Sequence, residues 1–324
     1  MPFKKYISII IKIVIVFFSF YFIYKQLIEN KSFEELNLDL LFNILIQNKG
    51  PILFVVFLMF VNWLFEAVKW KYMIGKIENI SILRSLQAVF SGITVSTFTP
   101  NRIGEYGGRV FCLEKGDRIK AVFITILCSM SQLLTTVIFG SISLLLLKNE
   151  IILENTFFKF FDVKILSFIL VISNLIFLIF YFNVAYIVNL LNRFKSLKNF
   201  SKYLEVLSLY NFKDLSINFL YSILRYCVFT IQFILLLNIF NVDIQFLEAL
   251  FSVMLIFLFI TVTPTITIAE IGVRGSVALF VLGVFSSNTV GILSAVSLLW
   301  LINLILPAVI GTVFIFSLKF FRKS

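Results

Sequence analysis

The chain has 324 residues and a mean hydropathy of +1.03; 60% of the residues are hydrophobic and only 14% are charged. Soluble domains are nearer half apolar and a quarter charged, so this composition excludes an ordinary soluble protein. The continuous apolar runs reach the roughly 20 residues that a helical span requires, and they lack the alternation of barrel strands. We therefore predict an all-α polytopic membrane protein in which residues 1–324 form a single transmembrane domain.

The formal net charge is +11, and most Lys and Arg residues lie between the apolar runs. This distribution is typical of the positive-inside bias and of contact with anionic lipid headgroups, and no nucleic-acid-binding motif accompanies it. Histidine is absent, and Cys112, Cys128 and Cys227 are far apart, which excludes His-dependent metal sites and triads. We predict no metal site, no cofactor and no nucleic-acid partner.

The apolar runs predict about six full spans in chain order. They lie near residues 7–28, 51–68, 120–147, 164–190, 215–240 and 289–317. The first run follows Lys4 and Lys5 as a signal peptide would, but it is too long and lacks a small-residue cleavage site, so we predict a retained span. Residues 33–49 and the basic residues 193–213 are predicted to be interfacial helices. Pro307 is expected to kink the last span.

Two further apolar regions, residues 83–113 and 246–286, are interrupted at Pro100 and Pro264, each of which follows a threonine. Proline removes a helical hydrogen bond and glycine allows close backbone approach, so each region is predicted to form two half-helices joined by an irregular turn. Such a turn is tolerated at membrane depth only where it is buried in protein or lines a wet cavity. The residues expected to form the turns are Pro100, Gly104, Gly107, Pro264 and Gly272.

Charge counting gives an orientation for these elements. Seventeen Lys and Arg residues fall on one side of the predicted spans, including those near both termini, against six on the other side. The positive-inside rule therefore predicts that both termini are cytoplasmic. Region 83–113 would then enter the membrane from the cytoplasm, and region 246–286 would enter from outside. We predict two oppositely oriented re-entrant hairpins, which form an inverted repeat of the kind associated with alternating access.

Both interrupted regions carry the motif Glu-x-Gly-x-Arg after Thr-Pro. Glu105 and Arg109, like Glu270 and Arg274, are spaced i,i+4, so each pair lies on one helix face and can form an ion pair. Each pair could simply neutralise itself and staple its own hairpin, but recurrence of the charges together with Thr-Pro and Gly favours a binding role. Arginine suits a pair of phosphate oxygens, and half-helix N-termini favour anions.

Other charged residues lie in or near apolar sequence. Arg102 adds a cation in the first interruption, and Arg225 could face a cavity, pair with a motif Glu or extend to the cytoplasmic interface. Glu66, with Asn62 one turn earlier, is a weaker candidate and is interpreted as an interfacial helix end beside Lys69. The predicted substrate-binding residues are therefore Arg102, Glu105, Arg109, Arg225, Glu270 and Arg274.

These motifs resemble those of the lysylphosphatidylglycerol synthetase transmembrane-region family, which are flippase-like and mostly bacterial or archaeal membrane proteins. The matching residues are Pro100, Arg102, Gly104, Glu105 and Arg109, then Pro264, Gly272, Val273 and Arg274. The second element departs from the common pattern, because Glu270 precedes Gly272 instead of following the arginine. The resemblance implies a stand-alone member without the soluble aminoacyl-transferase domain of two-part members. It also implies a location in the bacterial cytoplasmic membrane.

We expect a translocator of flippase or scramblase type rather than an enzyme. Its expected partners are membrane lipids, either an anionic phospholipid or a polyprenyl-phosphate-linked lipid, and assembly into a homo-oligomer is left open. One alternative is an intramembrane enzyme or accessory factor acting on a lipid-linked phosphate, with Glu as base and Arg as oxyanion support. Another is a non-transporting scaffold. The lack of His, of an acidic metal cluster and of a sizeable soluble loop disfavours the enzyme.

Overall fold

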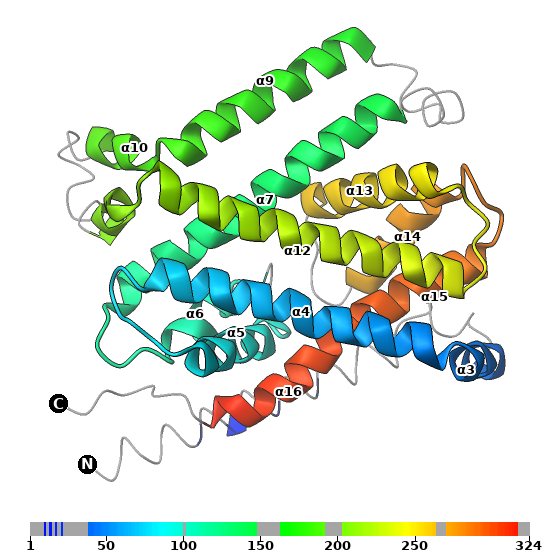
Figure 1. The fold of residues 1–324 in the computed structure, drawn as a ribbon, viewed down its shortest axis with the longest axis horizontal. Coiled ribbons are helices and arrows are strands. Elements are labelled where there is room, and N and C mark those ends of the chain that lie inside the picture. Colours follow the sequence, from blue (N-terminus) through cyan, green and yellow to red (C-terminus); the bar gives the residue numbers. More distant parts are fainter. Residues whose placement is uncertain are drawn as a thin grey trace.

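The computed structural model describes residues 38–99, 102–147, 163–191, 203–263 and 270–316, with a few isolated positions before residue 38. Within these ranges every regular element is a helix (Figure 1). The predicted first span at residues 7–28 lies outside the described residues, apart from isolated helical positions. Of the two predicted interfacial segments, the first contains helix α3 (Leu38–Gln47) and the second contains the short helix η4 (Glu205–Leu209).

Four helical segments are long and apolar enough to cross a membrane. They are α4 (Lys49–Ile74), α7 (Arg118–Leu146), α12 (Phe212–Ile239) and a last segment made of α15 (Thr289–Trp300), the π-helix η6 (Leu301–Ile305) and α16 (Leu306–Ile315). A fifth candidate, α9 (Val163–Phe182) with α10 (Val184–Leu191), is bent by 76° at its break. The predicted helical membrane class is confirmed, and this part of the chain is a multi-pass integral membrane protein.

Helix α4 extends past the predicted limit of residue 68 and ends at Ile74. Lys69 and Lys71, which follow the predicted limit, therefore lie within the helix, and the loop begins at Gly75. The sequence prediction ended this helix too early, because a lysine normally marks the end of a span. Lys69 is instead buried beside the carboxylate of Glu66. In the last segment, Pro307 lies directly after the π-helical turn and inside the continuous helical segment Thr289–Ile315.

Both interrupted regions consist of two helices that pack on each other. The first contains α5 (Ile82–Ser96) and α6 (Gly104–Val110), and the second contains α13 (Phe246–Val262) and α14 (Glu270–Leu282). The breaks between the helices span the predicted Thr-Pro positions, although Pro100 and Pro264 themselves lie outside the described residues. We call these pairs the first and the second hairpin.

The first hairpin begins and ends at the same end of the molecule. Arg84, in the first turn of α5, donates from Nε to the carbonyl oxygen of Cys112 at 2.8 Å and pairs with Glu114 at 3.0 Å, just past the end of α6. The carboxylate of Glu78, in the loop before α5, accepts backbone N–H bonds from residues 114–116. These contacts fasten the two ends of the hairpin together.

The second hairpin begins and ends at the opposite end. Helix α12 starts beside the first hairpin, because Asp214 in its first turn pairs with Lys76 at 3.0 Å. Just past its far end, the carbonyl oxygens of Phe240 and Asn241 accept bonds of 3.1 Å and 3.0 Å from Nδ2 of Asn288, which precedes α15. Helix α13 therefore begins, and α14 ends, near the far end of α12, which is about 42 Å long at 1.5 Å per residue.

Each hairpin also packs against the last long helix of the other half of the chain. Helix α5 lies along α16, and α13 lies along α7, while α4 and α12 pack on each other between them (Figure 1). A glycine lies at each close approach. A Cβ atom at Gly311 would lie 2.3 Å from the carbonyl oxygen of Phe90, and one at Gly140 would lie 2.4 Å from Cβ of Leu258. Each hairpin therefore packs closely against a helix from the other half of the chain.

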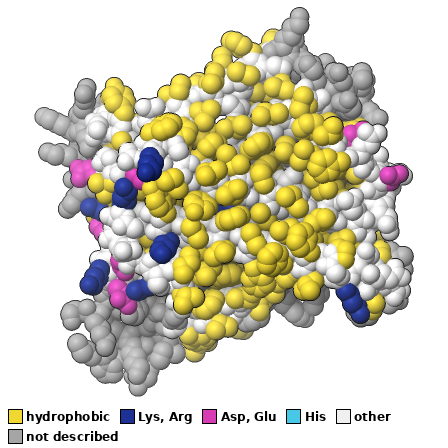
Figure 2. All heavy atoms as spheres, viewed as in Figure 1, with side chains coloured by type: hydrophobic (Ala, Val, Ile, Leu, Met, Phe, Trp, Pro, Cys, Tyr) yellow, Lys and Arg dark blue, Asp and Glu magenta, His cyan; other side chains and the backbone are white. Residues whose placement is uncertain are grey.

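The outer surface has the polarity expected of a membrane protein. Figure 2 shows a broad hydrophobic band across the molecule, with charged side chains gathered towards its two sides. Large apolar side chains on the long helices remain exposed, including Leu53 and Phe57 on α4, Leu220 on α12 and Val313 on α16. Such a continuous apolar surface is stable only in contact with lipid.

Gly311→Ala tests the close approach of α16 to α5. The added methyl group would overlap a backbone carbonyl, so we expect a loss of about 1–3 kcal/mol in folding free energy. Thermal unfolding in detergent micelles, followed by tryptophan fluorescence, measures this loss. Gly50→Ala is the matched control, because no atom lies within 4 Å of a Cβ atom there. Equal melting temperatures for the two variants would contradict the close approach.

The pH dependence of the melting temperature, compared between wild type and Glu78→Gln, tests whether Glu78 fastens the two ends of the first hairpin together. Burial alone would raise the pKa of the Glu78 carboxyl, but the N–H donors of residues 114–116 and the charge of Arg84 outweigh burial and hold the pKa below its usual value. A lowered folded-state pKa contributes stability that is present above the unfolded value of about 4.3 and is lost as the pH falls through the folded value. Wild type should therefore melt above Glu78→Gln at pH 7, and the gap should close on acidification.

Glu205→Gln, which changes an exposed carboxylate, should show no comparable gap at either pH. A gap between wild type and Glu78→Gln that stays constant down to the acid limit would contradict the role assigned to the Glu78 carboxylate.

Candidate functional site

A cavity of about 400 Å³ lies between the long helices and the two hairpins. This volume is within the range of about 300–1,000 Å³ that is typical of small-ligand sites. Its charged lining comes from both halves of the chain: Glu66, Lys69, Arg102, Glu105, Arg225 and Arg274. Four of these side chains are cations and two are carboxylates, so the formal charge of the lining is positive.

Glu66 is the centre of the charged wall. It lies on α4 with only 3% of its surface exposed. Its carboxylate is 2.7 Å from Nζ of Lys69, one turn along the same helix, and 2.6 Å from Nη1 of Arg109 on α6. It also accepts a hydrogen bond from Nη1 of Arg225 on α12. One carboxylate therefore joins three cations and three helices, which is how a buried charge is normally stabilised.

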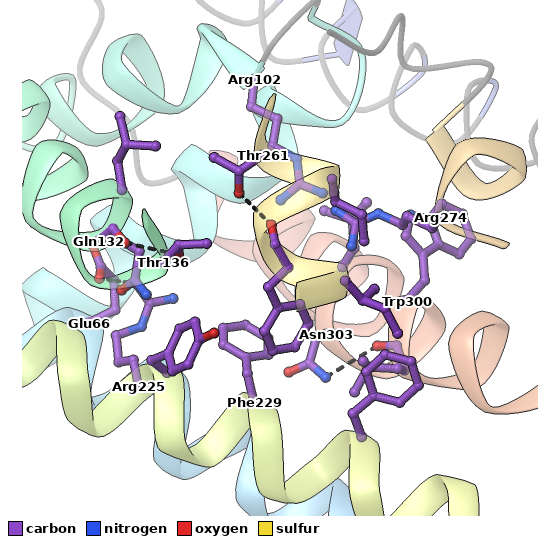
Figure 3. A pocket seen from close by; sticks show the side chains of 18 of the residues that line it. Glu66, Arg102, Gln132, Thr136, Arg225, Phe229, Thr261, Arg274, Trp300 and Asn303 are labelled. Carbon is purple, nitrogen blue, oxygen red and sulfur yellow. Dashed lines mark hydrogen bonds and ion pairs between the residues drawn. The ribbon is translucent and has the colours of Figure 1, made fainter. Parts of the chain in front are cut away.

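Further contacts hold Arg225 in a fixed orientation. Its Nε donates to Oδ1 of Asn62 at 3.0 Å, and Nη1 lies 3.4 Å from Oε1 of Gln132 on α7. Its guanidinium carbon lies 5.1 Å from the centre of the Trp63 ring, in the geometry of a cation–π contact. Arg225 thus faces the cavity and pairs with Glu66, whereas the alternative of extension to the interface is wrong (Figure 3).

Arg109 reaches Glu66 because α6 lies very close to α5. A Cβ atom at Gly108 would lie 2.6 Å from Cα of Gly92, so only glycine fits where the two helices meet. Arg109 is 2% exposed and also forms the expected i,i+4 ion pair with Glu105. Glu105 is more accessible, with 25% of its side chain exposed, and lines the cavity.

The break of the first hairpin carries Arg102 into the cavity lining. Its backbone has φ of 57°, in the left-handed region that non-glycine residues seldom adopt. Strained backbone of this kind is concentrated at functional sites. Gly104 follows, and a Cβ atom there would lie 2.5 Å from the carbonyl oxygen of Val95, so its role in the turn is sterically required. Gly107 has only one atom at 4.0 Å, and close packing does not require a glycine there.

The second hairpin contributes Arg274 from α14 to the same cavity. The side chain of Glu270, at the start of that helix, lies outside the described residues, so its pairing with Arg274 stays a prediction. Gly272 is helical, and a Cβ atom there would have no atom within 4 Å, so packing does not require a glycine at this position. The structure thus brings Arg102, Glu105, Arg225 and Arg274 to one cavity, with Arg109 directly behind it.

The rest of the lining is mainly apolar and aromatic. Phe229, which is labelled in Figure 3, and Phe233 come from α12, and Phe257 comes from α13. Two polar side chains, Trp300 and Asn303, lie at the junction of α15 and η6. The cavity therefore has charged and apolar walls, a combination that fits an amphipathic molecule. In the described part of the chain no group of His, Cys, Asp or Glu side chains is placed to bind a metal ion.

Sequence reasoning underrated Glu66. Its interpretation as an interfacial helix end is wrong, because the side chain is buried and lies in the charged core. Only its spacing from Lys69 and Asn62 gave a signal, whereas its main partners are remote in sequence. Gln132, Trp300 and Asn303 were not singled out, since a lone polar residue in an apolar span has no diagnostic pattern.

Comparison with known families agrees with the motif resemblance. A family model described as "Lysylphosphatidylglycerol synthase TM region" matches residues 9–311, which include both hairpins and every helix that lines the cavity. Comparisons with curated proteins and with solved structures gave no match.

Glu66→Gln is expected to destabilise the fold strongly. Removing the carboxylate leaves buried cations without their common partner, and breaking such a pair costs about 3–5 kcal/mol. Thermal unfolding in micelles measures the change. Glu105→Gln is the control, since Glu105 is partly exposed and has a smaller network of ion pairs. Adding Lys69→Met to Glu66→Gln should recover part of the loss by removing one of the unpaired charges. A Glu66→Gln protein as stable as wild type would contradict the central role of this carboxylate.

Proposed function

Because the chain belongs to the lysylphosphatidylglycerol synthase transmembrane-region family, we propose that it moves a phosphate-containing lipid from one leaflet of the membrane to the other. The observation that carries this proposal is the positively charged cavity beside an apolar wall, between two hairpins that start from opposite ends of the molecule. Family membership supports a role in lipid chemistry or transport, and the cavity supports transport.

The headgroup phosphate would bind among Arg102, Arg225 and Arg274, which come from three different elements. A planar guanidinium offers paired N–H donors that match phosphate oxygens. In the empty protein, Glu66 is the counter-ion of Arg225, and Glu105 pairs with Arg109 behind the cavity wall. A cavity of about 400 Å³ accommodates a headgroup better than a whole two-chain lipid, so the acyl chains would stay in the surrounding membrane.

An internal inverted repeat would supply the movement. The first hairpin packs on α16 and the second on α7, and a glycine marks each contact, Gly311 in one case and Gly140 in the other. Helices α4 and α12 hold equivalent places at the centre. Inverted repeats with broken helices at the substrate site are the usual architecture for alternating access. We propose that both hairpins are re-entrant and that their rocking exposes the cavity to each leaflet in turn.

The end that carries Lys76, Arg84 and Lys115 would face the cytoplasm of a bacterial cell, with both chain termini on that side. Positive residues accumulate on the cytoplasmic side of membrane proteins, which supports this orientation. The first hairpin would then open towards the cytoplasm and the second towards the outside.

We propose that the lipid leaves chemically unchanged. An intramembrane enzyme would need a general base, but both carboxylates that line the described part of the cavity are already ion-paired with arginine. The alternative of an enzyme or accessory factor that acts on a lipid-linked phosphate therefore has less support than transport.

Translocation in proteoliposomes tests the proposal. Phosphatidylglycerol with a fluorophore on its acyl chain keeps a native headgroup, and added dithionite bleaches only the outer leaflet. Protein-free vesicles should lose about half of the signal, whereas wild type should lose more as labelled lipid reaches the outside. Arg102→Gln and Arg274→Gln should slow this loss about ten-fold or more, because charge-assisted hydrogen bonds of about 1.5–3 kcal/mol are removed.

Lys115→Gln is the control for loss of a positive charge, because the Lys115 side chain is exposed at the charged end of the molecule and outside the cavity. It should leave the rate close to that of wild type. Melting temperatures verify that each variant is folded. Bleaching that stops at one half in wild type, or that is as fast in the arginine variants as in Lys115→Gln, would overturn the proposed transport site. A new lipid mass in the vesicles would favour the enzyme.

A further inference from the structure

A buried lysine lies at the boundary between the cavity and the packed interior. Lys69, in α4, is 1% exposed, yet it belongs to the cavity lining. Its Nζ is 2.7 Å from the carboxylate of Glu66 and donates to Oγ of Ser222 on α12 at 3.4 Å. An ionisable side chain inside a membrane protein is costly and marks a substrate site or a path for ions or protons.

The ion-paired cluster around Glu66 carries one positive charge in excess. Its members are the carboxylates of Glu66 and Glu105 and the cations of Lys69, Arg109 and Arg225. Three cations therefore face two carboxylates, and a buried charge without a counter-ion is unfavourable. Loss of one proton from a cation would balance the cluster, whereas protonation of either carboxylate would increase the excess.

Lys69 is the member of the cluster that can release this proton. A guanidinium group stays protonated in proteins, whereas a buried lysine can exist as the neutral amine. After the loss, Glu66 would keep two arginine partners, Nη1 of Arg109 at 2.6 Å and Nη1 of Arg225. The neutral form of Lys69 therefore leaves no carboxylate of the cluster without a cation.

The helices packed on α4 bring few other ionisable groups to Lys69. From α12, Arg225 shares the carboxylate of Glu66 with it, and from α7 the buried thiol of Cys128 lies close to it. The charged residue of α5, Arg84, is held at the charged end of the molecule by other contacts. The π-helix η6 contains no ionisable residue, and α3 precedes the opposite end of α4. The charge of Lys69 thus depends on these neighbours and on an anion in the cavity.

A column of buried polar groups leads from this lysine towards the start of α12. Oγ of Ser222 lies 2.5 Å from Oγ of Ser131 on α7. One turn closer to the start of α12, Nδ2 of Asn218 donates to the hydroxyl of Tyr181 at 2.8 Å, and that hydroxyl donates to the carbonyl oxygen of Leu215 at 3.0 Å. The four side chains are fully buried. Hydroxyl groups, together with water, can relay a proton along such a column.

We propose that Lys69 is a proton-binding site that couples transport to a proton gradient, with one proton carried for each headgroup phosphate. This inference rests on the proposed transport function. A phosphate bound at the arginines adds one negative charge beside the cluster and stabilises the ammonium form of Lys69. When the phosphate leaves, the excess positive charge returns, and the ammonium releases its proton to become the neutral amine. The column gives the proton a route to the charged end, and the cavity gives it a route to the opposite side.

The charge balance of this cycle makes a sharp prediction. A phosphodiester headgroup carries one negative charge and the accompanying proton carries one positive charge, so no net charge crosses the membrane. Transport should therefore follow a pH gradient and ignore the membrane potential. A carrier that moved the same anion without a proton would transfer one negative charge and would respond to the potential.

Separate gradients in proteoliposomes test the coupling. The probe is the acyl-chain-labelled phosphatidylglycerol described above, and a short dithionite pulse measures the fraction in the outer leaflet. When the lumen is about two pH units more acidic than the outside, with the potential clamped by potassium and valinomycin, wild type should move label outwards towards the roughly 100-fold ratio of the proton gradient. At equal pH and an inside-negative potential of about 100 mV, wild type should leave the label evenly distributed. Protein-free vesicles are measured under both gradients.

Lys69→Met removes the proton site and leaves two carboxylates paired with two arginines. It should lose the response to the pH gradient and gain a response to the potential, up to about 50-fold at about 100 mV. Lys69→Arg keeps the positive charge but cannot release a proton, so it should also lose the response to the pH gradient. This second variant covers the case in which the first fails to fold. Lys71→Met, on the same helix and outside the cavity, should behave as wild type.

The outcomes separate the coupling from the transport function. Accumulation driven by the pH gradient in wild type and Lys71→Met, and absent from the folded Lys69 variants, would establish the coupling. A wild type that translocates the lipid but is not driven by the pH gradient would overturn it and leave transport in place. A pH response that persists in folded Lys69→Met or Lys69→Arg would overturn the role of Lys69. Label that stays half protected from dithionite in the absence of any gradient would overturn the proposed function and the coupling with it.

Discussion

The charged core depends on one buried carboxylate, that of Glu66. It joins α4 to α6 through Arg109 and to α12 through Arg225. Desolvated ion pairs constrain a structure strongly, because loss of one partner leaves a costly unpaired charge. Glu66 therefore holds the first hairpin against the two central helices. The charged wall of the cavity and the attachment of the hairpin are consequences of the same contact.

Because Glu66 binds several cations, it also affects how a phosphate could bind in the cavity. The lining carries more cations than carboxylates, so the cavity attracts anions, yet two of its cations, Lys69 and Arg225, are already ion-paired with Glu66. In the proposed mechanism a phosphate competes with Glu66 for Arg225. Competition limits affinity, and a transport site requires such a limit, since a substrate must bind well enough to enter and weakly enough to leave.

The parts of the structure that could be predicted from the sequence are those with local causes. The breaks of the two hairpins follow from Thr-Pro and Gly, and the Glu105–Arg109 pair follows from its i,i+4 spacing. The role of Glu66 could not be predicted, because Arg109 and Arg225 lie 43 and 159 residues away from it and only helix packing brings them together.

The two halves of the chain are alike in arrangement and different in chemistry. Each hairpin packs on a long helix of the other half, but the ion pairs of Glu66 join α4, α6 and α12, whereas Arg274 comes to the cavity from the second hairpin. A headgroup that contacts both sides would bind across the interface between the halves. Its binding free energy would then depend on their relative position, and this dependence is what couples substrate binding to a change between two conformations.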